Sequence, residues 1–275
     1  IHGAVRFTLN DITDPYAGTL YRTAVGVGDY PVDQHHTRYS GWDDLPDLYF
    51  HPIPSYGFPL GIVIPAGFPG LLVAEKSVSV TNLVNGSTRL QPVVLQIGQA
   101  TGALAALAAA AGVDPSEVAV RRVQEAVLDA GGYLLPYLDL PAGDPRFKAM
   151  QRIGVTGILK GRGANVGWEN QTWFDADRTI AESELREGLR EVYPSVRSSV
   201  RETPVDGALL TAMLAEALGK PAGDIAAQTE RAAGLLSGYD PARPLTRLEC
   251  ALLIDAVADP FHAAEVDIYG NYKRK

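Results

Sequence analysis

The sequence predicts an α+β protein in two parts, with few strands and one long buried helix in residues 1–140 and a mainly helical domain in residues 141–275. Three observations support this prediction. Residues 92–111 are almost all apolar or small, which favours a long buried helix. Short apolar runs bounded by glycine or proline, at residues 62–64 and 71–74, indicate buried strands. Beyond a linker at residues 136–144, apolar residues recur at helical spacing.

Composition limits the classes of function. A hydrophobic content of 46% in 275 residues is enough for one large or two modest cores. The formal net charge of -8 argues against a nucleic-acid partner, because the only basic cluster is the terminal tail at residues 273–275. The single cysteine, Cys250, excludes an internal disulfide and is expected to be a buried, inert thiol. The sequence does not decide whether the protein is located in the cytoplasm or exported.

The elements of the first part follow from local patterns. Residues 5–9 alternate like a strand, and the proline-rich stretch 42–59 indicates loops with short extended pieces. Residues 81–89 are polar and predict a loop. A second helix is expected from Asp114, as the cap, through about Ala130, with Pro115 at its first position and glycines ending it.

The long helix is expected to begin near Pro92, since proline suits a first helical turn. Gly98 and Gly102 remove bulk from one face, which predicts close packing against it. A helix amino terminus also favours anions or electron-rich oxygens. A buried core helix remains the simpler interpretation. A membrane span is not expected, because Gln96, Gln99 and Thr101 interrupt the apolar run.

Three blocks of sequence, in order, resemble a known family. They are residues 28–36 (GDYPVDQHH), residues 70–76 (GLLVAEK), and residues 85–92 (NGSTRLQP) leading into 98–102 (GQATG). Over residues 25–113 the chain resembles the carboxyl-terminal half of a family of FAD-dependent oxidoreductases that genomes often label as xanthan lyases. It departs from the commoner pattern at Glu75-Lys76, where Gly-Arg is expected, and lacks a histidine near Asn82 or Asn85.

The resemblance implies a cofactor whose main binding unit is not in this sequence. An FAD-binding half should open with a strand, a Gly-x-Gly-x-x-Gly turn and a helix. No such unit occurs here, and the chain begins at Ile1 without an initiator Met. We therefore expect the carboxyl-terminal fragment of a two-domain FAD oxidoreductase fold, with FAD held mainly by an amino-terminal FAD-binding half of the same protein.

Candidate catalytic residues are Asp33, His35 and His36. A histidine that titrates near working pH could take a proton from a substrate hydroxyl while hydride leaves for the flavin, and Asp33 could orient the imidazole. In an extended segment only one of the two histidines would face the substrate. A metal site is not favoured, because a third ligand is not evident. Histidines that merely hold loops by hydrogen bonds are the remaining interpretation.

The resemblance also implies that the strand, loop and helix close over the flavin ring. The candidate cofactor contacts are Glu75, Asn82, Arg89, Gln91, Gly98 and Gln99, with Asn85 and Ser87 as further neutral partners. Arg89 could place positive charge beside the pyrimidine edge or grip a substrate carboxylate or sugar hydroxyl. A structural salt bridge to Glu75 is equally compatible with the sequence.

The tail resembles a surface-layer homology repeat. Residues 147–155 form an apolar stripe, a glycine turn and a loop with Trp168, Trp173 and Phe174 follow, and a helix is expected at residues 182–193. A second partial copy ends in residues 245–249 (LTRLE), a stretch that in such modules faces a cell-wall polymer. The simpler interpretation is that Thr246 caps a helix and Glu249 completes a capping box.

Three functional hypotheses remain at this point. The favoured one is the carboxyl-terminal portion of an FAD-dependent oxidoreductase that acts on a small molecule, such as a carbohydrate-like alcohol. A glycan- or wall-binding module is the alternative. A polysaccharide lyase is less favoured, because nothing in the sequence requires its chemistry.

Overall fold

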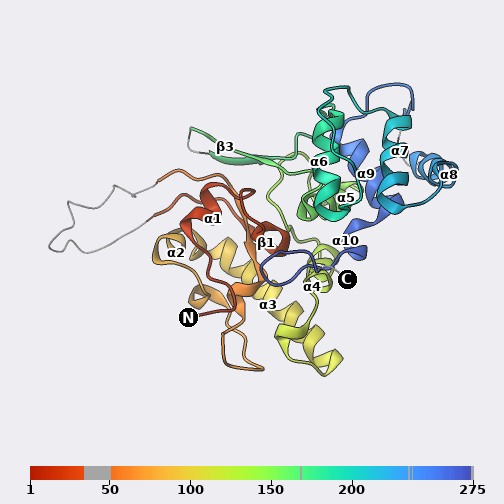
Figure 1. Cartoon of the computed structure of the whole chain (residues 1–275). Helices are drawn as coiled ribbons and strands as arrows, with labels where there is room; N and C mark the ends of the chain where they lie inside the picture. Colours follow the sequence, from red (N-terminus) through yellow and green to blue (C-terminus); the bar gives the residue numbers. More distant parts are fainter. Residues whose placement is uncertain (34–50, 168, 235, 237, 274–275) are drawn as a thin grey trace. The chain divides into compact units, whose positions relative to one another are not determined.

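The computed structural model describes residues 1–33, 51–167, 169–234, 236 and 238–273. Within these residues, ten α-helices accompany two small two-stranded sheets, which confirms the predicted α+β class. Contacts divide the chain into two compact units (Figure 1). Unit 1 comprises Ile1–Pro136, Gly163–Thr172 and Val266–Asn271, and unit 2 comprises Tyr137–Arg162, Trp173–Glu265 and the described residues from Tyr272 onward.

Unit 1 is built around one short sheet and one long helix. Its elements are α1 (Leu9–Thr13), β1 (Ala24–Gly28), β2 (Tyr56–Pro59), α2 (Asn82–Thr88), α3 (Gln91–Ala111) and α4 (Val120–Asp129). Strands β1 and β2 are antiparallel, with Ala24 opposite Pro59 and Gly28 opposite Tyr56. Helix α3 packs on β1 and α4. The core of this unit therefore lies between the sheet and one side of α3.

Helix α3 begins one residue before Pro92, which confirms the predicted start, and ends at Gly112 with a positive φ of 65°. Its buried stripe comprises Val93, Ile97, Ala100, Leu104 and Ala108. The opposite face is exposed. A Cβ added at Gly98 or Gly102 would meet no atom within 4 Å. The close packing predicted at these glycines is therefore not present within the described chain, which buries only one side of the helix.

By length and composition, α3 is the one helix of the described residues that could cross a bilayer, with a mean hydropathy of 1.6 over its apolar window. This is weak evidence, because core helices meet the same criterion. Its buried stripe packs within unit 1, as expected for a core helix with one free face.

Residues 81–89, predicted as a loop, are mostly helical. The Thr81 hydroxyl accepts a hydrogen bond from the Val84 N–H at 3.5 Å, so Thr81 is the amino-terminal cap of α2. A polar sequence thus became a helix because its first residue can cap one.

The apolar runs before α2 are not strands. Residues Leu60–Val63 form a 3-10 turn, and residues 71–74 are irregular. The Val73 N–H donates to the Val63 carbonyl at 2.9 Å, but Gly70 and Glu75 have positive φ on either side and turn the chain away from a ladder. Likewise, only Phe7 of residues 5–9 forms a bridge before α1 begins at Leu9.

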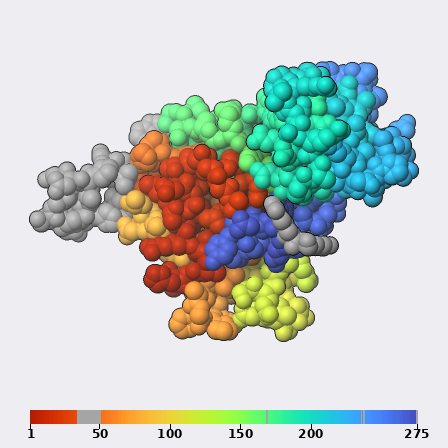
Figure 2. Space-filling model, in the orientation of Figure 1, coloured from red at the N-terminus to blue at the C-terminus, as the bar shows by residue number. Residues whose placement is uncertain are grey.

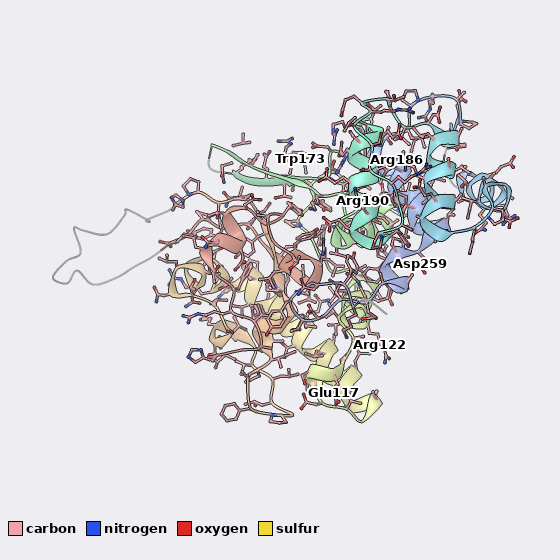
Figure 3. All side chains as sticks on the ribbon, viewed as in Figure 1. Glu117, Arg122, Trp173, Arg186, Arg190 and Asp259 are labelled. Atoms are coloured by element: carbon pink, nitrogen blue, oxygen red, sulfur yellow. The ribbon has the colours of Figure 1, made fainter. Side chains whose placement is uncertain are left out.

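The expected helix from Asp114 is interrupted. Asp114 and Glu117 form a capping box, with Pro115 in the first turn, but the turn they close is a 3-10 turn (Pro115–Glu117). The helix α4 begins only at Val120 and carries Arg122, which Figure 3 labels beside Glu117.

Two segments from late in the sequence complete unit 1. The sheet of β3 (Arg162–Val166) and β4 (Glu169–Trp173) contributes residues 163–172, and Thr172 donates from its hydroxyl to the Ser55 carbonyl at 2.8 Å. The segment Val266–Asn271 lies against the first residues of the chain (Figure 2), where Thr19 donates to the Tyr269 carbonyl at 2.7 Å.

Unit 2 is mainly helical. Its helices are α5 (Phe147–Thr156), α6 (Glu182–Val192), α7 (Gly207–Leu218), α8 (Ala222–Ala233), α9 (Arg247–Ala258) and α10 (Pro260–Ala263). The extended residues before α6, α7 and α9 are hydrogen-bonded to one another. The Val205 N–H donates to the Ile180 carbonyl at 2.9 Å, and the Leu245 N–H donates to the Val205 carbonyl at 2.8 Å. All three side chains are buried. Three helices therefore start from one hydrogen-bonded centre.

The start of α9 confirms the capping interpretation of the LTRLE stretch. The Thr246 hydroxyl accepts from the Glu249 N–H, and the Glu249 carboxylate accepts from the Thr246 N–H. Arg247 is 2% exposed and donates to the carbonyls of Phe174 and Lys160. Cys250 is buried, as expected, and burial raises the pKa of its thiol well above the usual range.

Candidate functional site

The predicted site residues lie on and beside the α2–α3 pair. Only Arg89 and Leu90 separate the two helices. Because the connection is so short, the end of α2 and the first turn of α3 are held close together. The described end of the candidate catalytic segment, residues 29–33, lies beside this junction through hydrogen bonds from α2.

Two hydroxyl groups, joined by a hydrogen bond, hold the middle of this segment. The Ser87 hydroxyl, on α2, donates to the Tyr30 carbonyl at 2.6 Å. The Tyr56 hydroxyl lies 2.7 Å from the Ser87 oxygen. Tyr56 is fully buried, and desolvation raises the pKa of its phenol beyond the usual range, so the phenol stays neutral.

Two further contacts fix the same segment. Val32 and His51 exchange backbone hydrogen bonds of 3.0 and 3.1 Å. The Asn170 side-chain amide, on β4, donates to the Asp29 carbonyl. The backbone on which Asp33 stands is thus pinned by α2, by residue 51 and by an element more than a hundred residues away.

Asp33 is the ion-pair partner of Arg89. An Arg89 Nη lies 3.6 Å from a carboxylate oxygen of Asp33 and donates to its carbonyl at 3.4 Å. Asp33 is buried, whereas the Arg89 side chain is 37% exposed. The salt bridge to Glu75 considered from the sequence is therefore wrong, and Glu75 instead pairs with its neighbour Lys76 at 3.8 Å on the surface.

His35 and His36 lie outside the described residues, so their roles stay predictions. Among the described side chains no group of three or more potential ligands could hold a metal ion.

The candidate cofactor contacts share exposure to solvent. Arg89 is partly covered, and the remaining five are exposed: Glu75 at a positive-φ turn, Asn82 and Gln91 at the first positions of α2 and α3, and Gly98 and Gln99 on the free face of α3. These positions are accessible to a group bound from outside this chain.

Two polar atoms at the end of α2 are buried without a hydrogen bond. They are the side-chain oxygen of Asn85 and the Nε of Arg89. The residues are four apart, so they lie on the same side of α2. Unpaired buried polar atoms are costly, so a polar ligand that reached this acceptor or this donor would satisfy it.

Sequence reasoning treated Gln96 as an interruption of the apolar helix and missed its contacts. Its side-chain oxygen accepts from the Val27 N–H at 2.9 Å, and its amide donates to the Val27 carbonyl at 3.0 Å. Gln96 therefore pairs with the edge of β1 as a neighbouring strand would. A polar residue within an apolar helix could have indicated this contact. The contact of Asn170 could not be predicted in the same way, because its partner Asp29 is remote in sequence.

Comparison with known families finds a match to the first part of the chain. Residues 1–127 match the model of the family described as FAD dependent oxidoreductase. The match confirms FAD as the expected cofactor of this segment and ends before the helical unit 2 begins. No curated protein and no solved structure matches the chain.

The residues of this segment fit part of a flavin. A flavin's pyrimidine edge presents an N–H flanked by two carbonyl oxygens, and the unpaired Asn85 oxygen and Arg89 Nε offer one acceptor and one donor. The first turn of α3 adds N–H groups that favour electron-rich oxygens. The pyrophosphate would need a glycine-rich turn that this sequence does not supply.

Proposed function

We propose that residues 1–140 are the carboxyl-terminal portion of an FAD-dependent oxidoreductase, which closes the flavin site and contacts a small-molecule substrate such as a carbohydrate-like alcohol. The observation that carries the proposal is the pair of unpaired buried atoms on Asn85 and Arg89, within the segment that matches the family. They lie at the junction where the segment bearing Asp33 meets the start of α3.

The partner of this portion is an amino-terminal FAD-binding half of the same protein, and the free face of α3 is its docking surface. Leu95 is 74% exposed on that face, beside glycines that leave room for another backbone. Phe68 and Leu71, in the turn before α2, are also exposed. Large exposed apolar side chains of this kind favour burial in an interface.

The protein's residues would divide the chemistry among them. A bound FAD would supply the acceptor for the hydride. Arg89 would donate a hydrogen bond to the pyrimidine edge, and its guanidinium pairs with the Asp33 carboxylate. Asp33 in turn orients His35 or His36, one of which takes the substrate hydroxyl proton.

The first test is the visible spectrum of the complete gene product. We expect oxidised flavin bands near about 375 and 450 nm, as a flavoenzyme shows. Residues 1–275 alone should bind little or no FAD, because the pyrophosphate site is supplied by the other half. A folded complete protein without these bands would refute the proposal.

The docking surface is tested by Leu95→Gln. In the complete protein this change should lower the FAD content, because it places a polar group in the interface between the two parts. Residues 1–275 alone should keep their melting temperature, since Leu95 is 74% exposed there. The matched control is Val200→Gln, at a residue 94% exposed in unit 2, which should change neither property. Unchanged FAD content in Leu95→Gln would contradict the assignment of this face.

The described residues of the LTRLE stretch do not favour a wall-binding role for the tail. The side chains of the LTRLE stretch that would face a polymer are engaged within unit 2: Thr246 and Glu249 cap α9, and Arg247 is buried.

A further inference from the structure

We propose that unit 2 contains a binding site for a small, mostly apolar molecule that carries a neutral or cationic hydrogen-bonding group. The site is the groove between α7 and α8, and we call it the α7–α8 groove. It is lined by small side chains of the two helices, including Ala208, Ala212 and Ala226, and by the described residues Leu236 and Tyr239.

The size of the groove suits a small molecule. Its volume is about 870 Å³. Sites that bind small organic ligands are mostly apolar and measure roughly 300 to 1,000 Å³. Alanines and glycines line both helices here, and their small side chains leave the space between the helices open.

A buried hydroxyl without a partner points to a ligand in this groove. Thr229, on α8, lines the groove and is 3% exposed, and its hydroxyl oxygen makes no hydrogen bond. Native proteins rarely leave such a group unpaired, because its desolvation is not compensated. A ligand with a hydrogen-bonding group would satisfy it.

Tyr239 supplies an aromatic wall. It approaches the start of α7 so closely that a Cβ at Gly207 would collide with its hydroxyl, so the glycine permits this placement. Partial burial raises the pKa of the Tyr239 phenol, which therefore stays neutral and able to hydrogen-bond at physiological pH.

Charge decides the class of ligand. Glu230 is the charged side chain among the described lining residues, which include no lysine or arginine. An anionic ligand would meet a carboxylate and no compensating cation, whereas a neutral or cationic ligand would not. The groove thus differs from a site for an anionic glycan, and it is independent of the flavin site in unit 1.

The test uses the neutral dye N-phenyl-1-naphthylamine, whose fluorescence rises in apolar surroundings. Two variants of α8 form a matched pair: Ala226→Phe fills the groove, and Ala227→Phe adds the same ring at an exposed neighbour that does not line it. We expect Ala226→Phe to weaken dye binding at least about tenfold and Ala227→Phe to leave it within about twofold, with both helical by circular dichroism. Equal affinities for the two variants would overturn the site.

The hydrogen bond is tested by Thr229→Val, which keeps the shape and removes the hydroxyl. We expect about fivefold weaker dye binding, in line with the loss of one hydrogen bond, and a melting temperature no lower than that of the unmodified chain. The anionic dye 8-anilinonaphthalene-1-sulfonate should lose no signal on Ala226→Phe, because the groove excludes it. Unchanged affinity in Thr229→Val, or loss of the anionic dye's signal on Ala226→Phe, would overturn the proposed ligand chemistry.

Discussion

At the scale of the residue, ion pairs decide which charged side chains are free to act. Arg89 and Asp33 were each singled out from the sequence, but their pairing was not, because 56 residues separate them and no spacing rule links them. Arg247, in contrast, belongs to the LTRLE stretch, which resembles one that faces a cell-wall polymer in surface-layer modules. Its exposed fraction of 2% makes it a structural residue of unit 2.

We expect Arg89→Ala to slow flavin reduction in the complete protein by about tenfold to a hundredfold, because a charged hydrogen-bond donor is lost where negative charge develops. Arg89→Lys should recover part of the rate, since it keeps the charge but not the planar fork. Stopped-flow absorbance at the flavin band measures both. If Arg89→Ala lowers the melting temperature while the folded protein keeps the original rate of flavin reduction, Arg89 has a structural role only.

Replacing Arg247 tests its structural role. It is paired with Glu184, its guanidinium lies 5.1 Å from the Phe174 ring centre, and its Nε donates to the Phe174 carbonyl at 2.8 Å. Glu184 is 37% exposed and keeps Arg178 as a partner, so the expected loss of about 2 to 6 kcal/mol comes mainly from the two hydrogen bonds to the Phe174 and Lys160 carbonyls. We expect Arg247→Ala to lower the free energy of unfolding of unit 2 by about this amount in a urea titration. A loss below about 1 kcal/mol would return Arg247 to the set of binding candidates.

At the scale of the element, α3 has one buried face and one exposed face. One face carries the buried stripe from Val93 to Ala108, and the other carries Leu95 and two glycines that nothing in the described chain covers. Its length and start were predictable from its apolar run and Pro92. Which side is free was not, because both sides are apolar or small and give no amphipathic signal.

The contacts of Gln96 predict a difference between two glutamines on α3. Gln96→Ala removes both hydrogen bonds to Val27 and should lower the free energy of unfolding by about 1 to 3 kcal/mol. Gln99→Ala is the matched control, and at an exposed position it should change stability by less than about 0.5 kcal/mol. Chemical denaturation of residues 1–275 measures both. Equal effects would mean that Gln96 does not hold β1.

At the scale of the whole molecule, both units are assembled from discontinuous segments. Residues 163–172 and 266–271 return to unit 1 after the chain has entered unit 2. A linear boundary near residue 141 follows composition along the chain and cannot anticipate such returns, because they depend on tertiary hydrogen bonds such as that of Thr172 to Ser55.

Charge networks make the stability of unit 2 depend on pH. Arg186 on α6, labelled in Figure 3, and Arg197 both bind the Glu216 carboxylate, and Arg186 also pairs with Glu182. Chiefly the hydrogen bond from Arg186 lowers the pKa of Glu216 from 4.5 to about 2. The stability from this lowered pKa is complete above the unfolded value and is lost as pH falls toward about 2.

We therefore expect urea midpoints for unit 2 to fall between about pH 5 and pH 2, with a shallower fall in Glu216→Gln. The variant should also be less stable than the unmodified chain at neutral pH, since it loses its charged partners. If the urea midpoints of the two proteins fall equally with pH, Glu216 does not contribute to the loss of stability in acid.

The sequence by itself determined the α+β class, the start of α3, the capping of α9 by Thr246 and Glu249, and the match of residues 1–127 to a family of FAD-dependent oxidoreductases. These features depend on residues close together in the chain or on recognisable blocks. Only the tertiary structure decided that Arg89 pairs with Asp33, that Gln96 binds the edge of β1, and that one face of α3 is left open. Those outcomes depend on which distant segments of the chain pack together, and the local sequence does not determine that.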